Sequence, residues 1–127
     1  MPIIGPWGGG NNFIKAMFEY LPKNGFTIVK DPFLNIPDII FLQSPKPDQY
    51  CKFSINEAIY IKQKIPSLKI VMRVNDCDAR KGTVGVDDMW IKCSNFVDKT
   101  IFVSHWMKEY FIKKGWKCND NCVIYNG

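Results

Sequence analysis

The sequence contains no apolar run that approaches the roughly 20 residues of a membrane-spanning helix. Its N-terminus, MPIIGPWGGG, also lacks the charged start and the long apolar stretch of a signal peptide. His105 is the single histidine, and the five cysteines include no CxxC pair. Because zinc sites normally need closely spaced Cys or His ligands, we expect reduced thiols and no metal. These absences predict a cytoplasmic protein.

Arginine is also scarce, since Arg73 and Arg80 are the only two among 17 basic residues. The net charge is +5, but the basic residues stand singly or in pairs rather than in one stripe, which argues against a nucleic-acid partner. Apolar residues make up 46% of the chain and charged residues 23%, proportions typical of a globular domain. We expect residues 1–127 to form one domain.

Short apolar runs alternate with segments of helical period from end to end, which is the pattern of βαβ units. None of the runs alternates cleanly with polar residues, as expected when helices cover both faces of a parallel sheet. The predicted fold is therefore α/β, a Rossmann-like three-layer sandwich with a mostly parallel sheet of about six strands. The expected strands are Ile3-Ile4, Thr27 to Val29, Ile39 to Leu42, Ile70 to Val74, Thr100 to Val103 and Val123 to Tyr125.

Four segments have the apolar spacing of a helix that packs against a sheet. The first begins near Asn11 or Asn12, the second opens with a capping box at Ser54 and Glu57, and Ser104 caps the fourth. The apolar positions that share one face are Phe13, Ala16, Met17, Tyr20 and Leu21; Ile55, Ala58, Ile59 and Ile65; Val86, Met89, Trp90 and Cys93; and Trp106, Met107, Tyr110 and Phe111. We expect the last three sets to face the core.

The first candidate site is the segment GPWGGGNN, Gly5 to Asn12, between the first expected strand and the first helix. Ligands bind outside the carboxyl ends of parallel strands, where glycines let backbone amides approach a phosphate or a sugar. The N-terminus of the following helix favours an anion. The segment is neither a P-loop nor a complete GxGxxG, because Phe13 stands where the last glycine would be. The alternative is a tight turn whose glycines need positive φ angles.

The second candidate site is RVNDCDARKGT, Arg73 to Thr83, directly after the fourth expected strand. Its carboxylate, amide and cationic side chains would place donors and acceptors at the rim of a cleft, which suits a polyhydroxylated ligand. Arg73 could orient a phosphate or a carboxylate through two parallel hydrogen bonds. The alternative is a solvated turn with local ion pairs, such as Asp78 with Arg80.

Together with TIFVSHWMKEYF and the closing VIYNG, these two segments resemble glycosyltransferase family 4, of the GT-B fold. The resemblance covers nearly the whole chain, and RVNDCDARKGT and VIYNG are its most specific parts. Members of that family have two Rossmann-like domains that face each other across a cleft. The resemblance implies that this chain is the N-terminal domain, which mainly receives the acceptor. The C-terminal domain, which mainly binds the nucleotide sugar, would then be absent.

The resemblance also implies roles for individual residues. Gly8, Gly9 and Gly10 match a glycine loop near the donor phosphates and the acceptor, and Asn11 begins the helix behind it. The residues that match a polar segment facing the cleft, or the serine that opens the helix after the fifth strand, are Arg73, Asn75, Asp76, Asp78 and Ser104. Many family members instead carry a histidine after the fourth strand, where Asn75-Asp76 stands here. From its position alone, Asp76 is the candidate for polarising the acceptor hydroxyl.

The implied activity is retaining transfer of a hexose from a nucleotide-sugar donor to an acceptor hydroxyl, without a cofactor or a required metal. The acceptor would be a carbohydrate, a lipid-linked molecule or a protein, and the resemblance leaves room for association with a membrane surface. We do not expect this domain alone to be an efficient enzyme, because most of the leaving-group stabilisation would come from its own missing C-terminal domain.

Two other functions compete with this interpretation. One is a non-catalytic carbohydrate- or nucleotide-binding module, which should close its last strand with a capping helix or a polar tail. The other is a NAD-linked oxidoreductase domain, which the incomplete glycine fingerprint and the lack of a well-placed acidic ribose ligand disfavour. His105 has no evident nucleophile partner, so we interpret it as a surface histidine rather than a catalytic one.

Overall fold

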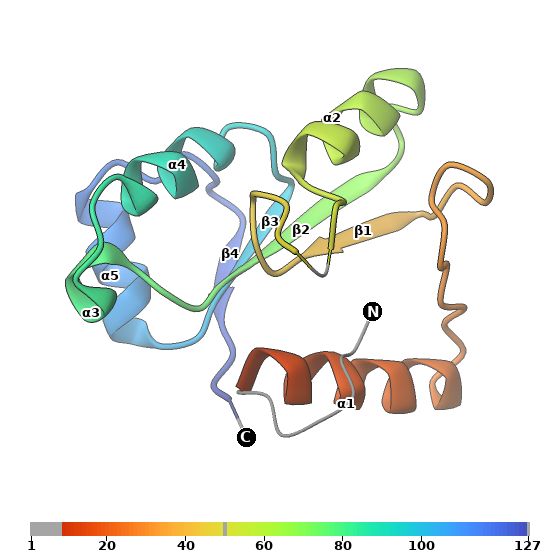
Figure 1. Ribbon diagram of the computed structural model, residues 1–127, viewed down its shortest axis with the longest axis horizontal. Coiled ribbons are helices and arrows are strands. Elements are labelled where there is room, and N and C mark those ends of the chain that lie inside the picture. Colours follow the sequence, from red (N-terminus) through yellow and green to blue (C-terminus); the bar gives the residue numbers. More distant parts are fainter. Residues whose placement is uncertain (1–8, 50, 127) are drawn as a thin grey trace. The chain divides into compact units, whose positions relative to one another are not determined.

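The computed structural model describes residues 9–49 and 51–126 (Figure 1). The chain divides into two compact units, one that extends to Pro37 and one from Asp38 to Tyr125. The described residues of the first unit contain one helix, and the second unit contains a parallel sheet with its connecting helices. The strand expected at Ile3-Ile4 lies outside the described residues.

The helix of the first unit is α1 (Gly9–Lys23), which begins slightly before the expected start near Asn11. It ends where Gly25 adopts a left-handed φ of 82°, a conformation that glycine reaches without strain. Beyond that glycine, the Phe26 amide donates to the Leu21 carbonyl at 3.1 Å and satisfies one of the last carbonyls of the helix. None of the residues of α1 is buried.

The expected strand from Thr27 to Val29 is wrong, because these residues join no sheet. The Asp31 carboxylate accepts the Phe33 amide at 2.9 Å and the Leu34 amide at 3.3 Å. This local turn diverts the chain directly after the short apolar run. β-branched residues without a neighbouring strand to pair with do not make a strand by propensity alone.

Four parallel strands form the sheet of the second unit, in the order β1-β2-β3-β4 (Figure 1). They are β1 (Ile39–Leu42), β2 (Lys69–Val74), β3 (Lys99–Phe102) and β4 (Asn121–Val123). The connections carry α2 (Ile55–Lys64), α3 (Asp78–Lys81) with α4 (Val86–Cys93), and α5 (His105–Lys113). The α/β class with a parallel sheet is confirmed, although the described sheet has four strands rather than about six.

Strand β4 spans Asn121–Val123, earlier than the expected run from Val123 to Tyr125. Val123 pairs with Phe102, the last residue of β3, and the Ile124 amide still donates to the Phe102 carbonyl at 2.9 Å. Beyond this point Ser104 turns the chain into α5, so no further β3 residue is left to pair with. The end of one strand thus fixes the end of its neighbour.

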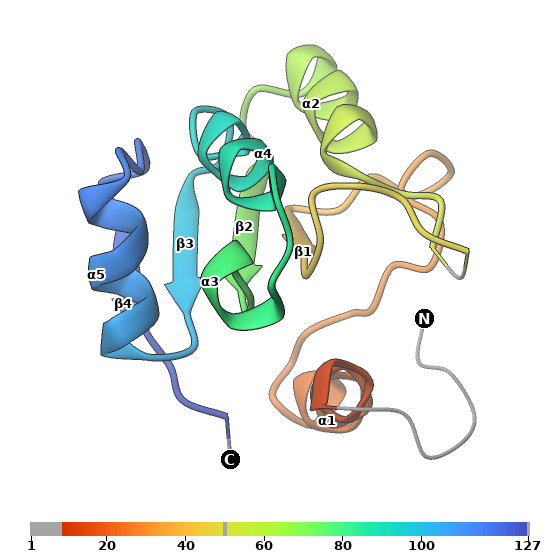
Figure 2. The same ribbon diagram turned by 60° about the vertical axis from the view of Figure 1, so that its left-hand side comes forward.

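Alternate strand residues gather on one face of the sheet. Ile70, Met72 and Val74 of β2 are fully buried there, and the register aligns Met72 with Thr100 and Val74 with Phe102. Parallel strands that neighbour one another in chain order, joined by crossovers of the usual right-handed kind, have their connecting helices on one side of the sheet. Accordingly, buried residues of α2, α4 and α5 join these strands in one cluster, and Figure 2 shows α4 and α5 on the same side of the strands. A helix on the opposite face stays a prediction.

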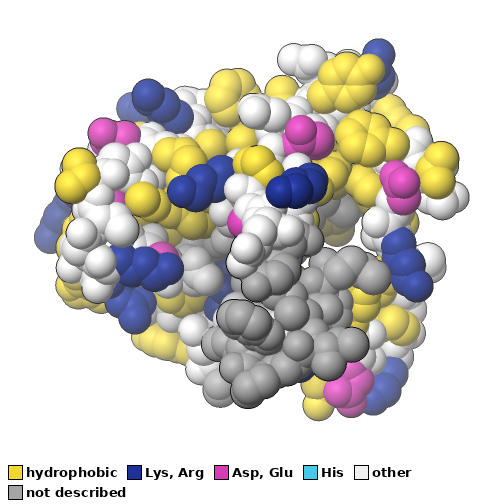
Figure 3. Space-filling view, viewed as in Figure 1, with side chains coloured by type: hydrophobic (Ala, Val, Ile, Leu, Met, Phe, Trp, Pro, Cys, Tyr) yellow, Lys and Arg dark blue, Asp and Glu magenta, His cyan; other side chains and the backbone are white. Residues whose placement is uncertain are grey.

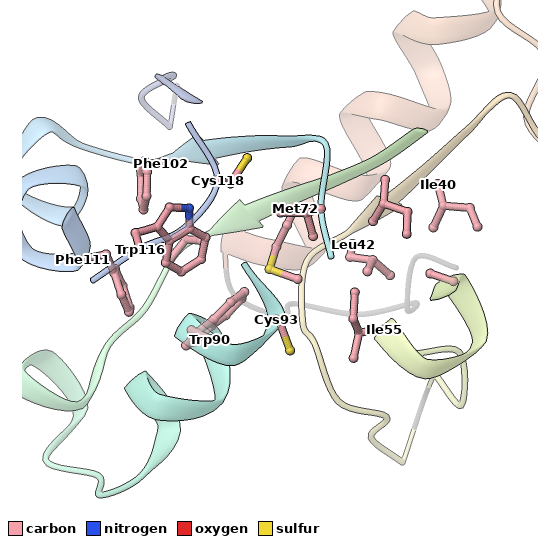
Figure 4. Close-up of a cluster of buried hydrophobic side chains, with 14 of the residues drawn as sticks. Ile40, Leu42, Ile55, Met72, Trp90, Cys93, Phe102, Phe111, Trp116 and Cys118 are labelled. Carbon is pink, nitrogen blue, oxygen red and sulfur yellow. The ribbon is translucent and has the colours of Figure 1, made fainter. Parts of the chain in front are cut away.

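Three aromatic rings form the part of the core beneath α5 (Figure 4). The ring centroid of Trp116 lies 5.3 Å from that of Phe102 and 5.2 Å from that of Phe111, both in edge-on geometry. The Trp116 indole nitrogen donates to the Thr100 hydroxyl at 3.0 Å. The buried indole therefore packs as an apolar group while its one polar atom is satisfied.

The capping residues marked the starts of α2 and α5 correctly. The Ser54 amide donates to the Glu57 carboxylate at 2.8 Å, and the Ser54 hydroxyl donates to the same oxygen. At α5, the Ser104 hydroxyl accepts the Met107 amide at 3.0 Å. The bonds donated by the Ser54 and Met107 amides satisfy backbone donors that the start of a helix leaves without an intrahelical partner.

Trp106 is the clear error among the expected inward positions, because its side chain is 52% exposed. Met107 and Phe111, four residues apart, are both fully buried and take the stripe of α5 that faces the sheet. Trp106 lies beside that stripe and stacks on Tyr110 instead. The apolar spacing alone could not separate these two neighbouring faces of the helix.

Replacing Phe111 tests this packing. Phe111 is fully buried, so Phe111→Ala should lower the free energy of unfolding by about 4 kcal/mol through lost transfer energy and a residual cavity. Its neighbour Ile112 is 47% exposed, and Ile112→Ala should cost less than about 1 kcal/mol. Urea unfolding followed by circular dichroism measures both values. Equal losses in the two variants would contradict the assignment of the buried face.

Candidate functional site

Polar side chains follow two neighbouring strands where those strands end. Asn75 and Asp76 come directly after β2, and Ser104 comes soon after β3. The carboxyl ends of parallel strands meet at one edge of a sheet, and all three residues are partly exposed there. We call this set of Asn75, Asp76 and Ser104 the polar edge. It brings together three of the residues that the sequence predicted for the site.

Asp76 is held by contacts within its own segment. One carboxylate oxygen accepts the Cys77 amide at 2.9 Å, and the other forms an ion pair with Lys81. The Lys81 side chain is 66% exposed, so water screens this pair and it contributes little to stability. A ligand hydroxyl could therefore replace the ammonium without a large cost.

Asp78 has a different environment, because its carboxylate bridges α3 and the start of α4. It accepts the Thr83 hydroxyl at 2.6 Å, the Val86 amide at 3.3 Å and the Asp87 amide at 3.0 Å. The Thr83 hydroxyl bond, followed by the Asp87 amide, lowers the pKa of Asp78. The local pair of Asp78 with Arg80, which belonged to the alternative interpretation of this segment as a solvated turn, does not form, since Asp78 serves instead as the acceptor for the first turn of α4.

Asp87 is the residue that the sequence interpretation missed. Its side chain is only 2% exposed, yet it carries a charge. The carboxylate accepts the Asp78 amide at 2.8 Å, the Lys114 ammonium at 2.8 Å and the Tyr110 hydroxyl. A pair of acidic residues in the first turn of a helix, with Asp87 three residues before the buried Trp90, is the only local signal for it.

The partners of Asp87 keep it ionised. Burial raises the pKa of Asp87, but hydrogen bonds from Lys114, Tyr110 and the Asp78 amide lower it more, so the net shift is downward. The same contacts raise the pKa of Lys114, with the Asp87 bond as the largest cause, and raise the pKa of Tyr110. This cluster of Asp78, Asp87, Tyr110 and Lys114, the acidic node, ties α3, α4 and α5 together beside the polar edge.

Arg73 lies on the other face of the sheet, because it alternates with Met72 and Val74 along β2. Its side chain is 2% exposed, and Nη1 donates to the Gln43 side chain at 3.3 Å. Burial lowers the pKa of Arg73, although a guanidinium stays protonated in proteins. Arg73 is thus placed apart from the helix-covered core while still near the ends of β1 and β2.

The glycine loop belongs to the other unit of the chain. Gly8 lies outside the described residues, and Gly9, Gly10 and Asn11 form the first turn of α1. A shared edge for Gly9 and Asp76 stays a prediction, since the two residues lie in different units.

His105 is exposed, as expected for a surface histidine. Its ring meets the ring of Tyr125 at a centroid distance of 6.0 Å and an angle of 61°. This is an edge contact between aromatic groups rather than a hydrogen-bonded pair with a nucleophile. The contact joins the first turn of α5 to the chain that follows β4.

A groove of about 580 Å³ lies between α2 and α4. Its apolar walls include Ile55, Ile59, Met89 and Phe96, and its charged residues are Lys46, Lys92 and Asp88. Its lining includes none of the residues of the polar edge. On the face seen in Figure 3, basic side chains are scattered among apolar and acidic ones, in agreement with the dispersed positive charge of the sequence.

No protein-family model, curated protein or solved structure matches this chain. Across residues 9–49 and 51–126, none of the helices has both the length and the apolar character needed to cross a bilayer. Nor does this part of the chain bring together three Cys, His, Asp or Glu side chains that could hold a metal ion.

Asp87→Asn tests the acidic node. Loss of the charge weakens the bonds from Lys114, Tyr110 and the Asp78 amide, and should lower the free energy of unfolding by about 2 kcal/mol. The matched control is Asp88→Asn, because Asp88 is the exposed neighbour in the same first turn of α4. Denaturant unfolding measures both, and a control as unstable as Asp87→Asn would contradict a special role for Asp87.

The node also predicts how stability depends on pH. The folded-state pKa values of Asp78 and Asp87 are lowered, so their stabilising contribution is present above about pH 4 and is lost as the pH falls through those values. Unfolding midpoints measured between neutral and acidic pH should fall more steeply in the parent protein than in Asp87→Asn. Parallel curves would rule out this source of acid sensitivity.

Proposed function

We propose that this chain is the N-terminal, acceptor-side half of a retaining glycosyltransferase of the hexosyltransferase type. The donor would be a nucleotide sugar, the acceptor would present a hydroxyl group, and no metal would be required. The observation that supports this most is the polar edge, where Asn75, Asp76 and Ser104 lie together at the carboxyl ends of parallel strands. The resemblance of RVNDCDARKGT and VIYNG to the family supplies the reaction class.

The polar edge offers the groups that an acceptor sugar needs. The Asn75 amide can donate and accept hydrogen bonds, and the Ser104 hydroxyl can donate one while it accepts the Met107 amide. The Asp76 carboxylate would accept the proton-bearing hydroxyl of the acceptor in place of Lys81, which raises the electron density on the attacking oxygen. These groups would hold that oxygen against the anomeric carbon on the face from which the diphosphate leaves.

Other parts of the proposal depend on the sequence pattern and on the resemblance. Gly8, Gly9, Gly10 and Asn11 would contribute near the donor phosphates, and Arg73 would orient an anionic group. Asp78 would act less directly than the resemblance implies, because its carboxylate already accepts three hydrogen bonds within the chain. The C-terminal domain would supply most of the stabilisation of the leaving diphosphate.

Asp76→Asn in the full-length protein encoded by the gene tests the proposal. The amide keeps the size of the carboxylate and can still accept the Cys77 amide, but it cannot take up a proton. We expect kcat to fall by about 100-fold with KM nearly unchanged, measured as nucleoside diphosphate released from nucleotide sugars.

The control is Asp88→Asn, an exposed acid away from the polar edge. Unchanged turnover in Asp76→Asn would remove Asp76 from the reaction. A full-length protein that binds carbohydrate or nucleotide but turns over no nucleotide sugar would show that the chain is a binding module instead.

A further inference from the structure

The large aromatic side chain of Trp106 is exposed to solvent beside the polar edge. Trp106 is 52% exposed in the first turn of α5, although burying an indole is among the largest apolar gains available to a folded chain. The contacts of Trp106 with Tyr110 and its place beside the polar edge suggest a binding role for this exposed ring.

The ring of Trp106 is immobilised from one side. It stacks on Tyr110, one helical turn away, at a centroid distance of 5.1 Å and an angle of 21°. Tyr110 is itself fixed, because its hydroxyl donates to the buried Asp87 and the Lys114 ammonium lies 4.9 Å from its ring centroid. One face of the indole is therefore covered by a rigid ring, and the exposed area belongs to the rest of the side chain.

The position of this ring relates it to the polar edge. Trp106 lies two residues after Ser104, and Figure 2 shows the first turn of α5 at the arrowhead end of β3. The next residue toward the strand, His105, contacts Tyr125 after β4. Aromatic faces thus lie along the same edge of the sheet as the amide, carboxylate and hydroxyl groups of the polar edge.

We propose that Trp106 is a stacking platform for a pyranose ring of the acceptor, held in place by Tyr110 and the acidic node. This inference rests on the proposed function and adds to it a subsite with a defined ligand chemistry. One side of a pyranose carries C–H groups with partial positive charge, which match the negative face of an indole. The hydroxyl groups around its rim match the donors and acceptors of Asn75, Asp76 and Ser104.

The fixed orientation of the Trp106 ring favours binding. A side chain that is already immobilised loses little rotamer freedom when a ligand binds, so more of the stacking energy appears as affinity. Tyr60 on α2 has the same exposed fraction, 52%, but its only described ring contact is the Lys64 ammonium at 4.9 Å. Tyr60 therefore serves as a matched control of equal exposure without an aromatic support.

Methyl β-D-glucopyranoside and methyl β-D-galactopyranoside at millimolar concentrations are suitable probes for nuclear magnetic resonance. The indole N–H signal of Trp106, assigned by its loss in Trp106→Phe, should shift with a saturable dependence on at least one glycoside. Saturation transfer to the glycoside should show about tenfold weaker binding in Trp106→Ala and a smaller loss in Trp106→Phe. Tyr110→Phe, which releases the platform from Asp87, should weaken binding about threefold, and Tyr60→Ala should leave it unchanged.

Three results would overturn the proposal: no shift of the Trp106 signal with either glycoside, binding in Trp106→Ala equal to that of the parent protein, or an equal loss in Tyr60→Ala. A Trp106 signal that moves with protein concentration in the absence of sugar would assign the surface to a second copy of the chain instead. Glycoside binding without turnover of nucleotide sugars would leave this inference standing while it removed the transferase proposal. Turnover of nucleotide sugars without a shift of the Trp106 signal would support the transferase proposal and overturn this inference.

Discussion

The hydrogen bonds and the ion pair of the buried Asp87 carboxylate hold the segments beside the polar edge in place. A charge removed from water is costly unless hydrogen bonds and an opposite charge compensate for it, and Asp87 receives both from separate pieces of chain. The Asp78 amide ties it to α3, whereas Tyr110 and Lys114 tie it to α5. The segment after β2 therefore has one favoured position, although it contains only a short helix and two glycines with positive φ.

That constraint links the core to the proposed chemistry. The helix-covered face of the sheet is packed with apolar side chains, and its carboxyl edge carries polar ones. Tyr110 contacts both, since its ring packs on the buried Phe111 and supports Trp106 while its hydroxyl reaches Asp87. A ligand at this edge would meet groups that are positioned before it arrives, which is the usual requirement for weak sugar contacts to add up.

The sequence predicted those features that depend on nearby residues. Helix starts at Ser54 and Ser104 follow from local capping chemistry, and the strands from Ile39 and Ile70 follow from continuous apolar runs. The sequence did not predict features that depend on distant residues. The apolar run at Thr27 pairs with no strand, and the role of Asp87 depends on contacts with α5, which no local pattern reveals. For the candidate site, the strand pattern placed Asn75, Asp76 and Ser104 correctly after β2 and β3, and their role in binding stays a prediction. The structural use of Asp78 and the exposure of Trp106 were not predicted, because both depend on contacts within the folded chain.

Amide hydrogen exchange at Asp78 and Asp87 tests the central claim most directly, because each amide donates to the carboxylate of the other. The account predicts that both amides exchange slowly at neutral pH and that both lose protection together in a Lys114→Met variant, while the Met107 amide bonded to Ser104 keeps its protection. Exchange of either aspartate amide at the rate of an unprotected peptide in the parent protein would contradict it.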